Sequence, residues 1–168
     1  LVSRRFAQMI ALPEPDKAYT GGLLHDIGIL VNSLVCPEEF RKAVKTAYRT
    51  RAPFHEAEEA TLGFTHSTSG RILADQCELP AGLAEVMERH HDVENARNAR
   101  ALVAIVRLSD LMCRLRGMGY GYYEPRAVDF AGDSAWSLLA KEFPMLATMD
   151  LARFTFDLDG AVEEIYQL

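Results

Sequence analysis

The sequence is poor in the features that mark secreted and membrane proteins. It has three cysteines in 168 residues, Cys36, Cys77 and Cys113, which are widely spaced and form no Cys-x-x-Cys pair. Such a set argues against a disulfide framework and indicates reduced thiols in a cytoplasmic compartment. No apolar run is long enough to span a bilayer, and residues 1–12 form an amphipathic pattern with arginines, unlike a secretory signal. We therefore expect no contact with a membrane.

Clusters of basic residues are also missing. The chain has 18 Lys and Arg against 24 Asp and Glu, a net charge of −6, which disfavours a general nucleic-acid surface. Its 49% hydrophobic and 25% charged residues are typical of a globular protein, and the length suits one domain with a real core. The chain begins with Leu inside a helical pattern, so we expect that it was cut from a longer protein.

No segment alternates apolar and polar residues as a half-buried strand would, whereas helical periodicity recurs throughout. Asp16 and Thr65 are expected to cap helices, while Pro37 and Pro80 suit the first turns of two others. The sequence thus predicts an all-α fold over residues 1–168, in which residues 117–125 form a loop. The predicted helices are 1–12, 16–34, 37–52, 55–62, 65–79, 80–91, 99–116, 133–142 and 150–166.

The helix predicted at residues 80–91 carries histidine on its apolar face. Leu83, Val86 and Met87 form the buried stripe, and His90, seven residues after Leu83, continues it. His91 lies about 100° further round the helix. An alternative is that both histidines only stabilise the helix C-terminus through its dipole and free carbonyl groups.

The helix predicted at residues 99–116 carries an aspartate in the same kind of place. Asp110 lies between Val106 and Cys113 on the apolar face that also holds Val103. A carboxylate there is costly unless it is paired or binds a metal ion. This spacing makes Asp110 a candidate ligand.

Two further helices carry candidate ligands. His66 lies on the face of Gly70, Leu73 and Cys77 in residues 65–79. His25 and Asp26 lie in a run of apolar residues and glycines, where the glycines permit close helix packing.

A lone core histidine is usually satisfied by a backbone carbonyl group, and Asp26 could pair with a buried arginine. These explanations would have to hold independently on four helices, so we favour one shared site. The fifth histidine, His55, follows a proline among glutamates and is expected at the surface. Imidazole and carboxylate ligands without thiolates suit iron, manganese, nickel, zinc or magnesium rather than a structural zinc site. The shared site is formed by His25, Asp26, His66, His90, His91 and Asp110.

The order and spacing of these residues resemble the HD superfamily of metal-dependent phosphohydrolases, and most closely the HDOD domains of bacterial signalling proteins. The similar stretches are residues 22–28, 59–70, 79–91 and 103–110, so the resemblance covers residues 1–116. It implies a helical bundle with 117–168 as a C-terminal helical extension. It also implies that His25 and Asp26 are the signature metal pair, that Asp110 is the distal aspartate, and that His66, His90 and His91 complete a site for one or two divalent ions.

Three departures from the family pattern bear on activity. The first histidine of the superfamily would precede residue 1, the lysine that often follows the His-Asp pair is Ile29, and no Gly-Tyr-Pro motif follows His91. The last departure argues against hydrolysis of cyclic di-GMP. The loss of the lysine removes a stabiliser of phosphoryl charge.

The resemblance implies a signalling domain that binds metal, is catalytically weak or inactive, and acts on partner proteins or an upstream domain, with phosphate or nucleotide as a possible ligand. The alternatives are an active metal-dependent phosphohydrolase or phosphodiesterase and a purely structural helical domain. The residues alone assign no catalytic group.

Overall fold

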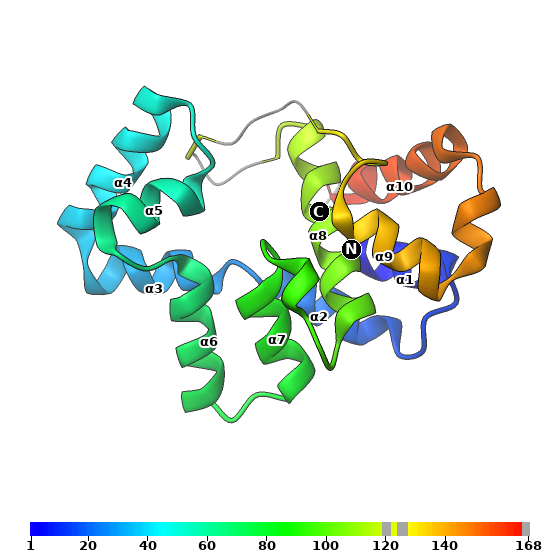
Figure 1. Ribbon diagram of the computed structural model, residues 1–168, viewed down its shortest axis with the longest axis horizontal. Coiled ribbons are helices and arrows are strands. Elements are labelled where there is room, and N and C mark those ends of the chain that lie inside the picture. The colour runs from blue at the N-terminus through cyan, green and yellow to red at the C-terminus, as the bar shows by residue number, and fades with distance from the viewer. Residues whose placement is uncertain (119–121, 124–127, 166–168) are drawn as a thin grey trace.

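The computed structural model describes residues 1–118, 122–123 and 128–165, which contain helices and no strand (Figure 1). The all-α prediction is therefore confirmed. Its α-helices are α1 (Val2–Met9), α2 (Pro15–Leu24), α3 (Ile27–Val35), α4 (Pro37–Thr50), α5 (Phe54–Leu62), α6 (His66–Gln76), α7 (Ala81–Arg89), α8 (Arg100–Leu115), α9 (Ser134–Glu142) and α10 (Leu151–Ile165). Short 3-10 turns occur at Val93–Asn95 and Pro144–Thr148.

Most helix ends follow the local signals in the sequence. Pro37 occupies the first turn of α4, and the side chain of Thr65 accepts a hydrogen bond from the backbone N–H of Thr68 at the start of α6. Gly63 ends α5 with φ of 78°, a conformation that costs glycine little. The prediction that Asp16 caps the second helix is wrong, because Pro15 begins α2 and Asp16 lies in its first turn, where it pairs with Arg4.

The helix predicted over residues 16–34 is divided in two at His25 and Asp26. Helix α2 ends at Leu24 and α3 begins at Ile27, and Asp26 has φ of −99° and ψ of 9°. The break lets α2 pack against α1 and α8 while α3 packs against α6. An added Cβ at Gly28 would collide with the carbonyl oxygen of His66, so the backbones of α3 and α6 are in contact there. The His-Asp pair therefore lies where the chain changes direction.

The largest core surrounds α8. Val103, Ile105, Val106 and Leu108 of this helix are buried against α1, α2, α9 and α10. Truncating such a residue, for example Leu108→Ala, typically costs about 2–5 kcal/mol of stability. The central helix is thus a rigid platform for Asp110, which it carries on its partly buried side.

A second, smaller core lies at the other end of the molecule, where α3, α4 and α5 gather on the left of Figure 1. It consists of Ala43, Ala47, Phe54 and Ala57, with Ile29 among the partly buried residues packed against it. Helices α6 and α7 pack against each other around a third small core of Ala74, Ala84 and Met87. This arrangement brings residues from both cores to the break between α2 and α3.

The C-terminal helices belong to the larger core. Trp136 of α9 and Phe154 of α10 pack edge to face, with ring centroids 5.6 Å apart, and Leu139 is fully buried.

The predicted loop at residues 117–125 lies partly outside the described residues, which include Tyr122 and Tyr123 but not residues 119–121 or 124–127. Among the helices described, none combines the length and apolar character required to cross a bilayer.

Candidate metal centre

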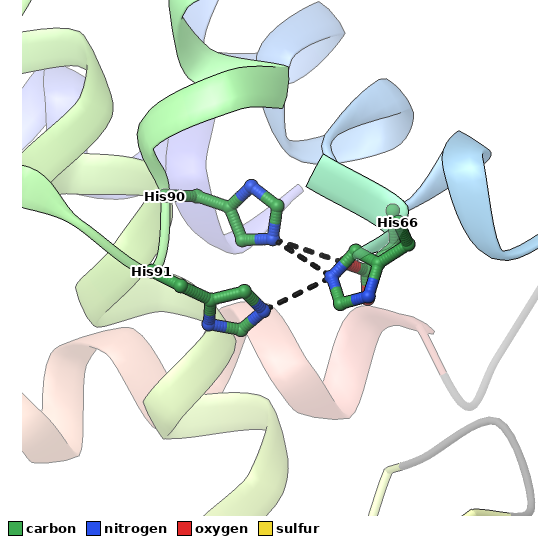
Figure 2. A group of neighbouring side chains, drawn as sticks. His66, His90 and His91 are labelled. Atoms are coloured by element: carbon green, nitrogen blue, oxygen red, sulfur yellow. Dashed lines mark hydrogen bonds and ion pairs between the residues drawn. The ribbon is translucent and has the colours of Figure 1, made fainter. Parts of the chain in front are cut away.

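Four of the predicted ligands converge at the junction of the two cores. Ligand atoms of Asp26, His66, His90 and His91 all lie within 4.8 Å of one another. The Nε2 atom of His66 is 3.3 Å from Nε2 of His90 and 3.0 Å from Nε2 of His91 (Figure 2). Asp26 Oδ1 is 3.3 Å from Nε2 of both His66 and His90. We call these four residues the donor cluster.

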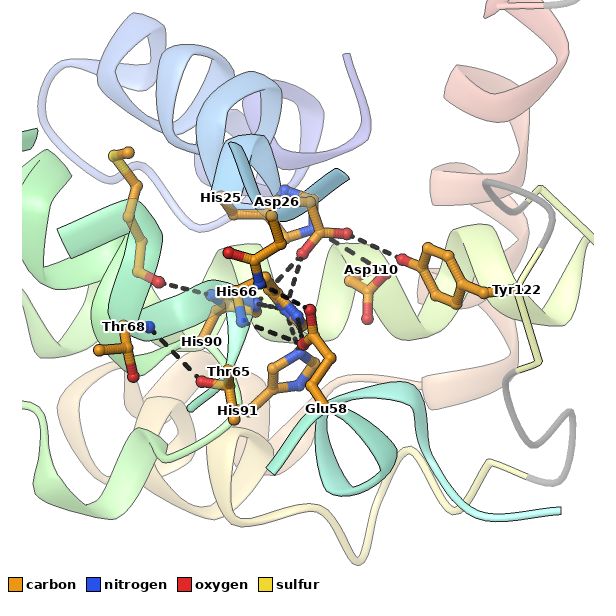
Figure 3. A network of polar contacts seen from close by, with 12 residues as sticks. His25, Asp26, Glu58, Thr65, His66, Thr68, His90, His91, Asp110 and Tyr122 are labelled. Carbon is orange, nitrogen blue, oxygen red and sulfur yellow. Dashed lines mark hydrogen bonds and ion pairs between the residues drawn. The ribbon is translucent and has the colours of Figure 1, made fainter. Parts of the chain in front are cut away.

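His66 is oriented by a buried chain of polar side chains behind it. The Glu58 carboxylate contacts Nδ1 of His66 and accepts a 3.0 Å hydrogen bond from its backbone N–H. Glu58 is fully buried, and its other oxygen accepts a 2.9 Å bond from Asn32 Nδ2. Asn32 in turn accepts a bond from the Ser69 hydroxyl. Helices α3, α5 and α6 thus fix one imidazole and turn its Nε2 toward Asp26 (Figure 3).

His90 and His91 follow the end of α7, where backbone carbonyl groups lack partners within the helix. His90 Nδ1 lies 3.1 Å from the carbonyl oxygen of Val86 and 3.2 Å from that of Met87. A carbonyl oxygen can only accept, so Nδ1 carries the proton and Nε2 presents a lone pair to the cluster. The other nitrogen of His91 points away from His66 in Figure 2, and its ring stacks on that of His55 at 4.2 Å.

The second oxygen of Asp26 faces a different group of side chains. His25 Nε2 is 3.4 Å from Asp26 Oδ2 and 4.0 Å from Asp110 Oδ1, and the Tyr122 hydroxyl donates a 3.2 Å hydrogen bond to the same Oδ2 (Figure 3). Asp110 also lies 3.6 Å from Nη1 of Arg114 on the next turn of α8. His25 and Asp110 therefore adjoin the donor cluster without being part of it.

Burial and mutual charge set the protonation of these groups. Burial opposes ionisation of Asp26, but the charge of His25 and hydrogen bonds from His66 and His90 hold the pKa of that carboxyl well below its usual range. Burial also opposes charge on His66, but hydrogen bonds and charges from Asp26 and Glu58 outweigh it and raise its pKa to about 10. Burial is the largest cause of a lowered pKa at His90 and His91, and neighbouring histidines add to it. The imidazoles of His90 and His91 are therefore neutral, whereas that of His66 is charged and paired with carboxylates.

The distances fit ligands that share one ion. Two ligands held at about 2.0–2.1 Å from a tetrahedral ion lie roughly 3.3 Å apart. The four distances given above between ligand atoms of the donor cluster are 3.0–3.3 Å. The donor set, three imidazole nitrogens and one carboxylate oxygen, suits first-row transition metals and zinc. The residues present thus fit a divalent metal ion.

All six predicted ligands lie in one neighbourhood, four in the donor cluster and two beside it. Sequence analysis missed Glu58 and Tyr122. Glu58 could have been found, since it shares a helical face with Phe54 and Ala57, whereas no local pattern marks Tyr122. The prediction that His55 lies at the surface is wrong: it is half-buried, and burial lowers its pKa to about 4. Cys77, expected on the buried face of its helix, is exposed because α6 ends before it.

Comparisons with known proteins agree with the fold. The model of the HDOD domain family matches residues 1–93, more than half of the chain. A crystal structure of an HDOD domain protein with unknown function from Geobacter sulfurreducens aligns with a TM-score of 0.79 at 24% sequence identity, over 99% of this chain. The chain spans 59% of the length of that protein, and no curated protein matches. The HDOD match confirms the resemblance found in the sequence, and the chain belongs to the HDOD domain family.

Proposed function

We propose that this HDOD domain is a signalling module that binds a divalent metal ion through Asp26, His66, His90 and His91. The observation that carries the proposal is the spacing of their ligand atoms, all within 4.8 Å in a largely buried site. Without an ion, neutral His90 and His91 would both direct acceptor nitrogens at the Nε2–H group of His66, which Asp26 also faces, so acceptors would outnumber donors at a cost in free energy. A bound ion converts that cost into stabilisation of the native state.

The surroundings of the ligands support metal binding more than an ordinary buried ion pair. Histidines that bind metal almost always donate their other N–H group to a carboxylate or a backbone carbonyl. His66 has Glu58 in that role, and His90 has the carbonyl oxygens of Val86 and Met87. These partners fix the ring orientations before an ion arrives.

Weak or absent catalysis is part of the same proposal. The position of the family lysine is occupied by Ile29, which packs against the small core around Phe54. An apolar side chain there supplies no cation to charge that develops on a phosphate ester, and losing one such contact typically costs roughly two to three orders of magnitude in rate. We expect the domain to act through partner proteins or an attached domain.

Metal analysis of the purified protein tests the proposal. We expect close to one equivalent of a transition metal or zinc, and the loss of most of it in Asp26→Asn. Asp75→Asn is the matched control, because Asp75 is exposed on α6 and pairs with Arg71. A folded Asp26→Asn variant that keeps the metal content and affinity of the parent would contradict the proposal.

The second candidate is an active phosphodiesterase, which the position of Asp26 favours. Its two oxygens face opposite sides, so the carboxylate could bridge two ions, with His25 and Asp110 on the second side. Two ions so bridged would supply an activated water and a clamp for phosphate. Robust turnover of a phosphodiester panel by metal-loaded protein, absent in Asp26→Asn, would establish the enzyme instead of the signalling module.

A further inference from the structure

A band of positive charge follows the exposed face of α4, the helix on the left of Figure 1. Residues 41–51 hold five of the chain's 18 Lys and Arg and none of its 24 Asp and Glu. In the sequence these basic residues form only short runs. The helix brings Lys42, Lys45 and Arg49 onto one face, since residues three and four apart are neighbours on a helix surface. We call these three exposed residues the basic stripe.

The basic stripe is not neutralised by the protein's own acidic groups. In the part of the chain that the structure describes, no ion pair joins Lys42, Lys45 or Arg49 to an Asp or Glu. Arg41, by contrast, pairs with Glu38 at 3.0 Å. Like charges three and four residues apart destabilise a helix. The free protein therefore bears a repulsion along α4 that a negatively charged partner would remove.

Helix α4 holds the basic stripe on a rigid support. Its opposite face packs on α5 through Ala43 and Ala47, which are fully buried. The rings of Phe40 in α4 and Phe54 in α5 meet edge to face, with centroids 5.6 Å apart. Tyr48, next to Arg49 in the chain, is 53% exposed, and tyrosine and arginine are enriched where proteins bind each other. These features suit a preorganised surface for another protein.

The size of the basic stripe favours a short acidic segment as its occupant. From Lys42 to Arg49 the helix rises about 10 Å, close to the distance of about 8–10 Å over which salt screens exposed charges. All of the chain's Asp and Glu lie outside residues 41–51, and the net charge is −6. A nucleic acid or an anionic membrane extends further than the stripe and would meet this acidic remainder. A short segment can stay on α4 alone.

We propose that the basic stripe binds a partner protein through an acidic segment whose carboxylates recur every three or four residues. The proposal deepens the proposed function, because it names the partner surface of the signalling module, and it rests on the signalling role rather than on metal. Phe54, which contacts Phe40 of α4, also stacks on His66 with ring centroids 6.2 Å apart. One buried ring thus separates α4 from the donor cluster, and any coupling between partner and ion would be reciprocal.

A matched pair of peptides tests the charge requirement. The acidic probe is a capped helical peptide with glutamate at every third or fourth position, and the control probe has glutamine in each of those places. An exposed ion pair contributes up to about fivefold in affinity, so three pairs should make the acidic probe bind at least about tenfold more tightly at physiological salt. Equal binding of the two probes, or binding of neither, would overturn the proposal.

Two triple variants with equal net charge locate the surface. Lys42→Gln/Lys45→Gln/Arg49→Gln removes the basic stripe and should weaken binding of the acidic probe by about tenfold. The control removes the same charge from three exposed residues elsewhere, Arg97→Gln, Lys141→Gln and Arg153→Gln. It should change binding by less than about twofold, and exposed substitutions of this kind leave both variants folded. Equal losses in the two variants would reduce the effect to net charge and overturn the proposal.

Other polyanions and the metal are tested separately. Single-stranded DNA and phosphatidylserine vesicles should each bind more weakly than the acidic probe. If either binds more tightly and depends on the basic stripe, the surface belongs to that ligand and the proposal is overturned. All titrations are run on metal-loaded and on chelator-treated protein. Stripe-dependent binding of the acidic probe in either form supports the docking surface, so failure of the metal proposal is seen by itself.

Discussion

The two oxygens of Asp26 face surroundings that differ in enclosure and in support. Oδ1 faces His66 and His90, which are 2% and 1% exposed and are held by further buried groups behind them. Oδ2 faces His25 and Tyr122, beside a cavity of about 610 Å³. We call these the enclosed side and the open side. The comparison teaches that one carboxylate can face a closely held group of imidazoles on one side and a cavity on the other.

The difference arises from the helices that supply each side. The enclosed side is built where α3, α5, α6 and α7 meet, and Glu58 and Asn32 fill the space behind its imidazoles. The open side lies between α2 and α8, where Gly22 and Ser109 line the cavity. Preorganisation should therefore make the enclosed side the stronger contributor to both metal affinity and stability.

The largest effect is expected when the support of the enclosed side is removed. Glu58→Ala leaves His66 and Asn32 without their buried partner, which should cost about 3–5 kcal/mol of unfolding free energy and about 10–100-fold in metal affinity. Urea denaturation and metal titration measure the two losses. Glu59→Ala is the matched control, because Glu59 is the next residue along the chain and its side chain is exposed. A loss in Glu58→Ala no larger than in the control would remove the distinction between the two sides.

A pH effect on stability should follow from the pairing of His66 with Asp26 and Glu58. In metal-free protein the pKa of His66 is raised from 6.5 to about 10 by Asp26 and Glu58 against the cost of burial. The stability that this shift contributes is fully present below pH 6.5 and is lost as pH rises through 10. The unfolding free energy of metal-free protein should therefore fall between pH 6.5 and 10, and fall less in Glu58→Gln. Parallel curves for the two proteins would contradict the charge assignment of His66.

A smaller effect is expected from chelation. An ion that binds only the native state adds about 2.7 kcal/mol when its free concentration is one hundred times its dissociation constant. Verified removal of the ion should lower the melting temperature by several degrees at pH 7, and re-addition of metal should restore it. His66→Ala should melt at one temperature with or without chelator, as the control. An unchanged melting temperature in the parent would favour satisfied core histidines without metal.

The smallest effect should come from the open side. Tyr122→Phe removes the hydrogen bond to Asp26 Oδ2 but keeps the ring that stacks on Phe54 at 4.4 Å. A single such bond contributes about 0.5–1.5 kcal/mol, so metal affinity should change by roughly tenfold at most. Tyr123→Phe, whose ring packs against Tyr48, is the control. A loss in Tyr122→Phe as large as that in Glu58→Ala would make the two sides equivalent.

The sequence predicts most helices because prolines, caps and apolar periodicity are local signals. Pro37 and Thr65 mark the starts of α4 and α6 where they are expected. The break at His25 and Asp26 has no proline, so continuous periodicity conceals it. It depends on the packing of α3 against α6, which is a contact between distant segments.

The convergence of the ligand residues could be predicted because polar side chains on apolar faces are costly, a rule that needs no structure. The same rule applied to α5 would have found Glu58, which lies on the face of Phe54 and Ala57. Tyr122 could not be found, because its partner Asp26 lies 96 residues earlier in the chain. Division of the six residues into a cluster and two neighbours required three-dimensional distances.

The contact at Gly28 has a consequence for the size of ion expected at the donor cluster. Because the backbone of α3 touches that of α6 at the carbonyl group of His66, the helix that follows Asp26 and the helix that begins with His66 cannot approach each other further. Ca²⁺ needs six to eight oxygen ligands at about 2.3–2.6 Å, which would require these donors to spread. We therefore expect the nitrogen-rich donor cluster, on two helices packed as closely as glycine allows, to favour a small transition-metal ion over calcium.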